Sequence, residues 1–324
     1  MWQSWHECDP LAARRRPGTG NCAPLDETGG IGLGAPRAPW HCSVASRKSV
    51  VDLIVTYWPF VAGLLATGII SGIAAGLLGI GGGAIIVPAL ATSLQLMGYD
   101  GDVVQHVAVG TSLAIIIPTG IASARAHDRR GAVDREVLKL WAPVIVAATL
   151  LGGLMAGLYS GNVLRIVFGV MALFIAANIL LPFQERLMGH LGGSPLTHRI
   201  SAAVVGYVSA LMGVGGGSLS VPTLHAFGAS MHKAVGTGAA IGVFIALSGT
   251  LGFIVSGWSV ADRPPLSLGY ISLPALVLIG VTAALCAPFG AALAHRLQQR
   301  TLKLAFAAFL AFVGLNMLWK VLAG

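Results

Sequence analysis

The sequence predicts an all-α polytopic membrane protein made of two inverted repeats. The first reason is composition: 55% of the 324 residues are hydrophobic and only 10% are charged, whereas soluble domains carry about a quarter charged residues. The second is a set of six apolar stretches, most of them long enough for a hydrocarbon core that needs roughly 20 residues. The third is a glycine-rich motif that occurs twice. The six stretches are 107–124, 140–158, 166–183, 234–257, 271–293 and 304–319.

The chain divides into four parts. Residues 1–50 are rich in Gly, Pro and Arg and lack apolar periodicity, so we expect a disordered tail or a misplaced translation start. Residues 51–183 form the first transmembrane repeat, 184–199 a polar linker, and 200–324 the second transmembrane repeat.

The repeated motif is Gly79-Ile80-Gly81-Gly82-Gly83 in the first half and Gly213-Val214-Gly215-Gly216-Gly217 in the second. Pro88 and Pro222 follow at the same spacing, and we expect them to mark helix breaks together with the glycines. Broken backbone at membrane depth is tolerated only where protein buries it or water reaches it. Two breaks in matching positions therefore indicate the binding site of a transporter.

Each half follows the same order: an apolar run, a glycine break, a short apolar arm and about three spanning helices. The arms at 200–212 and 218–229 are too short to span, which predicts a re-entrant hairpin. Residues 53–78 in the first half are long enough to cross completely, so a full crossing and a bent helix both remain open there.

The basic residues predict opposite orientations for the two halves. In the first half the connector after 107–124 is basic (Arg125, Arg129, Arg130, Arg135, Lys139), whereas its counterpart in the second half offers Asp262 and Arg263. One helix later the charge lies in the second half, at Arg296, Arg300 and Lys303. Because basic loops stay in the cytoplasm, equivalent connectors lie on opposite faces and the repeats are inverted.

The breaks predict an anion site. A helix that starts at a break has unpaired N–H groups and a partial positive charge, and glycines let a ligand approach closely. All 12 carboxylates fall outside the apolar stretches and the breaks, which favours an anion over a cation held by backbone carbonyls. The expected substrate-binding residues are Gly81, Gly82, Gly83, Ala84, Gly215, Gly216, Gly217, Ser218, Ser220, Thr111 and Thr237.

Simpler roles stand beside these expectations. Glycines also let membrane helices pack closely, and Thr111 and Thr237 can bond their own helix backbone. His106 and His232 occupy equivalent positions, and His225 lies in the second short arm. Each histidine is a candidate proton or anion contact, because histidine titrates near neutrality, or an anchor at the interface.

Other classes of protein fit less well. The net charge of +8 comes from basic residues in short connectors, so no nucleic-acid partner is expected. The four cysteines show no metal-ligand spacing, and we expect no metal, no cofactor and no enzyme activity. An intramembrane serine hydrolase using Ser218 is the alternative, but Gly217-Ser218-Leu219-Ser220 is not a Gly-x-Ser-x-Gly elbow.

The duplicated Gly-Ile/Val-Gly-Gly-Gly…Val-Pro motif, with Ala-Val-Gly-Thr at 108–111 and 234–237, resembles the TauE/SafE family over residues 60–322. This resemblance implies a multi-pass permease of a cell inner membrane for sulfite or a small organosulfonate. Export is favoured, since an inside-negative potential drives an anion outward; another solute such as a carboxylate stays open. The expected partners are the small anionic substrate and the lipid bilayer, and a homo-oligomer is left open.

Overall fold

The computed structural model describes residues 50–78, 82–99, 101–181, 194–260, 263–294 and 299–323. The chain divides into two units, residues 1–57 and residues 58–324. In the first unit the structure describes only residues 50–57, which begin a helix. The predicted tail, apart from Val50, therefore lies outside the described residues, as do Gly81 and most of the predicted linker.

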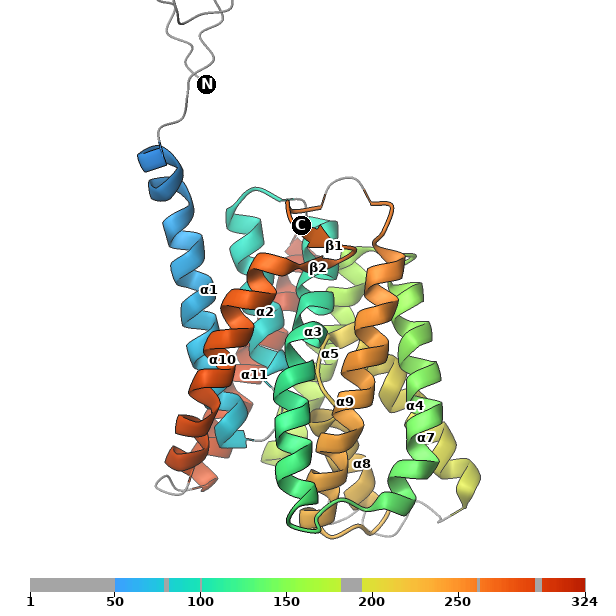
Figure 1. Ribbon diagram of the computed structural model, residues 1–324. Helices are drawn as coiled ribbons and strands as arrows, with labels where there is room; N and C mark the ends of the chain where they lie inside the picture. The colour runs from blue at the N-terminus through green and yellow to red at the C-terminus, as the bar shows by residue number, and fades with distance from the viewer. Residues whose placement is uncertain are drawn as a thin grey trace, which may run out of the picture. The chain divides into compact units, whose positions relative to one another are not determined.

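Both halves show the same order of elements, with a glycine break between the first long helix and a short one. The first half contains α1 (Val50–Leu78), α2 (Gly83–Leu96), α3 (Gly101–Asp128), α4 (Arg135–Ala156) and α5 (Gly161–Leu180) (Figure 1). The second contains α7 (Pro195–Met212), α8 (Gly217–Ala226), α9 (Met231–Ser256), α10 (Leu273–Ala294) and α11 (Gln299–Ala323). An antiparallel hairpin of two short strands, β1 (Ser267–Leu268) and β2 (Ile271–Ser272), separates α9 from α10.

Polar caps explain where several helices begin. The Asp134 side chain accepts the amides of Glu136 and Val137 at 3.1 and 3.2 Å and starts α4. Ser194 accepts the Thr197 amide at 3.2 Å, and Pro195 occupies the first turn of α7. Helix α7 therefore begins before residue 200, where the second repeat was predicted to start, and residues 195–199 of the predicted linker are helical.

Within the described ranges, six helices are long and apolar enough to cross a membrane: α3, α4, α5, α9, α10 and α11. They coincide with the six predicted stretches, which confirms the mostly helical fold with six candidate spans. Large apolar side chains cover their outer faces, including Phe289 at 72% and Phe312 at 68% exposure. Contact with lipid tails suits such a surface, since water would penalise an apolar area of this extent.

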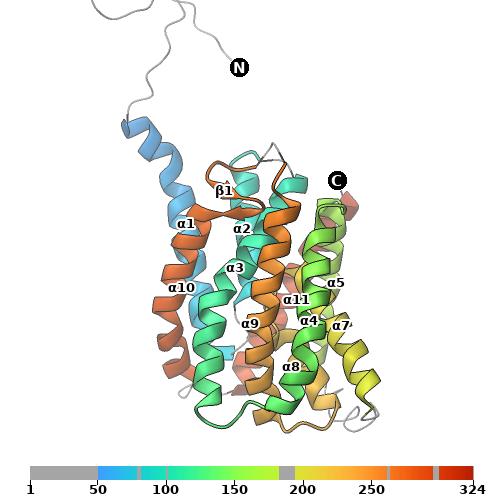
Figure 2. The same ribbon diagram turned by 45° about the vertical axis from the view of Figure 1, so that its right-hand side comes forward.

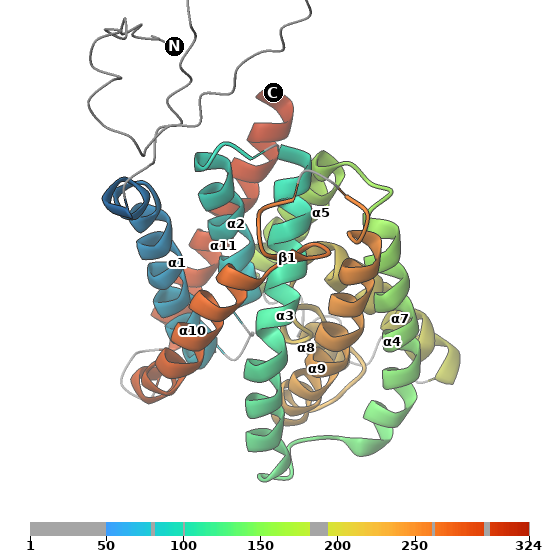
Figure 3. The ribbon, with the colours of Figure 1, turned by 45° about the horizontal axis from the view of Figure 1, so that its top comes forward.

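The long helices pack in pairs that join the two halves. Helices α3 and α9 lie side by side and run in opposite directions (Figures 1 and 2). Helix α4 packs against α7 and α9, and α5 packs against α11. Figure 3 shows α3 between α10 and α9. The two short helices lie toward opposite ends, α2 in the upper part of Figure 1 and α8 in the lower part.

Candidate functional site

The two glycine breaks meet on one face of α3. The Ser112 hydroxyl donates a hydrogen bond of 2.7 Å to the carbonyl of Gly213, where α7 ends. A methyl group added to Gly83, at the start of α2, would lie 2.7 Å from the same carbonyl oxygen. Ile116, one turn beyond Ser112, would contact a methyl group on either Gly83 or Gly215. The fold therefore brings together two segments that the sequence places 134 residues apart.

Glycine conformation shapes both breaks. Gly82 precedes α2 with a φ of 71°, and Gly213 ends α7 with a φ of 70°. L-amino acids with a Cβ rarely adopt this left-handed backbone, so glycine is required at both places. In α7 the turn is closed by the amides of Gly213 and Val214, which both donate to the Ser209 carbonyl.

The first amides of each short helix donate to carbonyls of the glycine break before it. At the start of α2, Ile85 and Ile86 both donate to the Gly82 carbonyl. At the start of α8, Ser220 donates to Gly216 at 2.8 Å, and the Gly217 amide has no backbone acceptor among the described residues. Unpaired amides at a helix start carry a partial positive charge.

Close packing surrounds the second break. A methyl group on Gly216 would lie 2.7 Å from the Gly242 nitrogen and 2.8 Å from the Gly238 carbonyl oxygen of α9. Ser218 and Ser220 follow in α8 and are 6% and 0% exposed. Neither hydroxyl has a hydrogen-bond partner within the described part of the chain. The glycines thus hold helices in contact in this conformation, while the serines supply buried donors.

Thr111 and Thr237 form equivalent contacts between the halves. The Thr111 hydroxyl accepts the Ser272 amide at 2.9 Å, and the Thr237 hydroxyl accepts the Asp134 amide at 2.8 Å. Gly110, directly before Thr111, packs against the carbonyl of Tyr270, two residues before Ser272. In the same way Gly236, directly before Thr237, packs against the carbonyl of Ala132, two residues before Asp134. The repeated Ala-Val-Gly-Thr segments therefore hold the start of a helix in the other half. Neither threonine bonds its own helix backbone, which was the simpler role considered for it.

The three candidate histidines lie in different surroundings. His106 is 4% exposed and stacks on Tyr270, with Nδ1 2.7 Å from the Asp102 carbonyl oxygen and Nε2 2.8 Å from that of Ala156. His232 is exposed at the start of α9. His225 ends α8, with Nδ1 2.9 Å from the Ala229 carbonyl oxygen. The structure does not bring these side chains to one place.

Tyr270 completes the contact with His106. Its side chain is 5% exposed at the turn between β1 and β2. Burial raises the pKa of the Tyr270 hydroxyl, partly offset by the Arg263 charge, so the phenol stays neutral at physiological pH.

The structure corrects the prediction that Pro88 and Pro222 mark the helix breaks. Both lie inside helices, α2 and α8, which continue through them. The interruptions end at Gly83 and Gly217, five residues earlier. Each proline lacks an N–H, so the carbonyl four residues before it, on Ala84 or Ser218, loses its helical donor. The prolines thus modify the first turns of the short helices and are not themselves the breaks.

Two buried polar side chains were missed by the sequence prediction. Gln105 on α3 is fully buried, and neither amide atom has a partner among the residues described. Arg165 is 9% exposed inside α5, and its Nη1 donates to Asn162 at 2.8 Å. The sequence offered one sign of Gln105: it is a polar residue directly before His106, at the edge of the apolar stretch 107–124.

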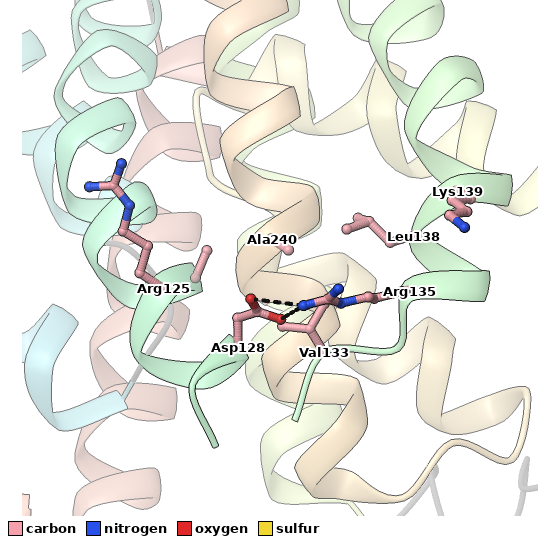
Figure 4. A pocket seen from close by; sticks show the side chains of 8 residues that line it. Arg125, Asp128, Val133, Arg135, Leu138, Lys139 and Ala240 are labelled. Atoms are coloured by element: carbon pink, nitrogen blue, oxygen red, sulfur yellow. Dashed lines mark hydrogen bonds and ion pairs between the residues drawn. The ribbon is translucent and has the colours of Figure 1, made fainter. Parts of the chain in front are cut away.

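A cavity of about 380 Å³ opens at the end where α3 passes into α4 (Figure 4). Asp128 pairs with Arg135 at 3.3 Å, while Arg125 and Lys139, on opposite sides, have no ionic partner within the described ranges. The cavity is therefore net basic. Its lining residues are Ala124, Arg125, Asp128, Val133, Arg135, Leu138, Lys139 and Ala240.

Comparison with known families identifies the family of the chain. Residues 64–317 match the family described as "Sulfite exporter TauE/SafE". The chain belongs to the TauE/SafE family. It is therefore a multi-pass membrane permease, and the predicted resemblance is confirmed.

Relatives of the TauE/SafE chain carry transporter names. It is 35% identical over 261 residues to a "Probable membrane transporter protein" of Haemophilus influenzae, covering 81% of this chain and 99% of that protein. It is 27% identical over 279 residues to "Probable membrane transporter protein YunE" of Bacillus subtilis, covering 79% and 97%. A similarly named protein of Methanocaldococcus jannaschii is 23% identical over 259 residues, covering 79% and 94%. No solved structure matches the chain.

Proposed function

We propose that this permease exports a small sulfur-containing anion, sulfite or an organosulfonate, across a cell inner membrane. The anion would be held near the midplane where the two glycine breaks meet. The family supports the substrate class through its description as sulfite exporters. The geometry of the breaks supports the sign of the charge.

One observation carries the proposal: two buried hydroxyl donors without acceptors lie directly after the second break. They are the hydroxyls of Ser218 and Ser220, which have no hydrogen-bond partner among the described residues. No Asp or Glu is among the buried side chains of the described residues. Unpaired buried donors cost free energy unless a ligand or water accepts from them. A small oxyanion offers several acceptor atoms, whereas a cation offers none.

Antiparallel packing supports inverted repeats. Helices α3 and α9, which follow the breaks in the two halves, run in opposite directions (Figure 1). The short helices α2 and α8 lie toward opposite ends of this bundle. Inversion would direct the two helix starts toward one point from opposite sides of the membrane.

The basic cavity supports an entrance from the cytoplasm. Arg125, Arg135 and Lys139 line it, and basic connectors face the cytoplasm in membrane proteins. Between the cavity and the breaks lies an apolar contact: a methyl group on Gly120 would touch Val243 at 3.3 Å and Ile116 at 3.8 Å. An anion would gather in the cavity and reach the breaks when this contact opens.

The membrane potential can drive export of an anion, so the mechanism does not need buried carboxylates that carry protons. An anion leaving a negative cytoplasm gains about 2.3 kcal/mol per charge per 100 mV. The hydrolase alternative gains no support, because Ser218 has no histidine partner among the described side chains.

Ligand binding by the purified protein tests this proposal. Thermal unfolding would be followed with sulfite, thiosulfate, sulfoacetate, sulfolactate, acetate and phosphate. We expect sulfite or one of the organosulfonates to raise Tm most, because ligand binding to the folded state stabilises it. A larger shift with acetate or phosphate would contradict the substrate class, and stabilisation by cations alone would contradict the sign of the site.

A further inference from the structure

Gln105 is an unusual residue for the interior of a membrane helix. Its side chain is 0% exposed, and both Nε2 and Oε1 lack a hydrogen-bond partner among the described residues. The other glutamine in this part of the protein, Gln95, differs: it is partly exposed, and Lys320 Nζ donates to its Oε1 at 3.2 Å. Gln105 therefore carries two unsatisfied polar groups in the protein interior.

Helical spacing places Gln105 on the face of α3 that meets the breaks. Positions 105, 109, 112 and 116 follow i, i+4, i+7 and i+11 and share one face of a helix. Along this face the Val109 Cα lies 2.8 Å from a methyl group added to Gly213, and Ser112 donates to the Gly213 carbonyl. Gln105 lies one turn from Val109, toward the start of α3.

Leaving both amide atoms unpaired is costly. A buried donor or acceptor without a partner costs about as much as its full desolvation, whereas an apolar side chain of similar shape costs nothing of this kind. Methionine at this position would fill the same space and remove the penalty. A residue that destabilises the empty protein is typical of a binding site.

We propose that Gln105 contacts the permeating anion and completes its site in the first half. This inference rests on the proposed function. Gln105 Nε2 donates to an oxygen of the anion, alongside the hydroxyls of Ser218 and Ser220. Its Oε1 accepts from the hydroxyl of a protonated oxyanion, such as hydrogensulfite, or from a water molecule that accompanies the anion.

Two substitutions at this position test the role. Gln105→Met keeps the length and removes both polar atoms, and Gln105→Glu keeps the shape and adds a negative charge. The matched control is Gln95→Met, which removes an engaged glutamine outside the site. Each purified variant would be measured for Tm without substrate and for the KM of sulfite flux into liposomes.

The expected results separate binding from structure. Gln105→Met raises KM at least tenfold, with Tm equal to or above that of the wild type. Gln105→Glu abolishes flux through repulsion of the anion, and Gln95→Met leaves KM unchanged. An unchanged KM in Gln105→Met would overturn the inference, and so would a Tm that falls together with flux, because Gln105 would then be a structural residue. Failure of the proposed function looks different, since the wild type itself would then carry no sulfite.

Discussion

Gly83 and Gly216 combine two properties that rarely occur at one residue. Each lies at the start of a short helix, and each touches the backbone of another segment so closely that no Cβ fits. Close packing holds the empty protein together, and the same absence of Cβ atoms lets an anion reach the amides when the helices separate.

Alanine at these glycines tests the packing. A methyl group at Gly83 or Gly216 meets backbone atoms at 2.7 Å, so we expect each variant to lose about 1–3 kcal/mol of stability. Gly280→Ala on α10 is the control, because no atom lies within 4 Å of the added methyl group. There we expect a gain of about 0.5–1 kcal/mol from helix propensity. Equal Tm values for all three variants, measured in detergent, would refute the close contacts.

Serine substitution tests the donors in α8. Ser218→Ala and Ser220→Ala remove hydroxyls that have no partner in the described structure, so Tm should stay constant or rise. The KM for sulfite should increase several-fold. Thr223→Val in the same helix is the control, because the Thr223 hydroxyl donates to the Leu219 carbonyl at 2.7 Å. If KM changed no more in the serine variants than in the control, the hydroxyls would not contact the substrate.

At the scale of elements, the repeated Ala-Val-Gly-Thr segments join the halves. Thr111 on α3 holds the residue before α10, and Thr237 on α9 holds the N-cap of α4. Each contact therefore fixes a spanning helix of one half against the central helix of the other. This role is structural. It gives a reason for the repetition of both segments, although each threonine hydroxyl is engaged by an amide of the other half and not by a glycine break.

Removing these acceptors should destabilise the protein. Thr111→Val and Thr237→Val leave the Ser272 and Asp134 amides unpaired, at a cost of about 1–3 kcal/mol each. Thr→Ser at either position keeps the hydroxyl and should retain most of the stability. Thermal unfolding of the four variants checks this, and a serine variant as unstable as the valine variant would show that the methyl group, not the hydroxyl, matters.

The sequence predicted the elements better than their contacts. Uninterrupted apolar stretches identified the six spanning helices, and three consecutive glycines identified each break, because these signals are local. Pro88 and Pro222 were assigned to the breaks because proline usually ends a helix, but a helix tolerates the loss of one bond near its start. The meeting of Ser112 with Gly213, and the burial of Gln105, depend on packing between distant segments, which no local pattern encodes.

At the scale of the whole molecule, opposite ends of α4 should face opposite sides of the membrane. Arg130 precedes α4 in the basic connector and Ser160 follows it, and both are exposed. In a chain without native cysteines, Arg130→Cys should react with an impermeant maleimide only from the cytoplasm, and Ser160→Cys only from outside. The opposite labelling would reverse the proposed orientation, and labelling of both from one side would exclude α4 as a span.

Voltage-driven flux of sulfite through the purified protein in liposomes tests the central claim most directly. We predict that an inside-negative potential drives sulfite out, that reversing the potential reverses the flux, and that Gly83→Ala and Gly216→Ala reduce it while Gly280→Ala does not. A wild-type protein that carries no anion under either potential would contradict the claim that the meeting glycine breaks form an anion site.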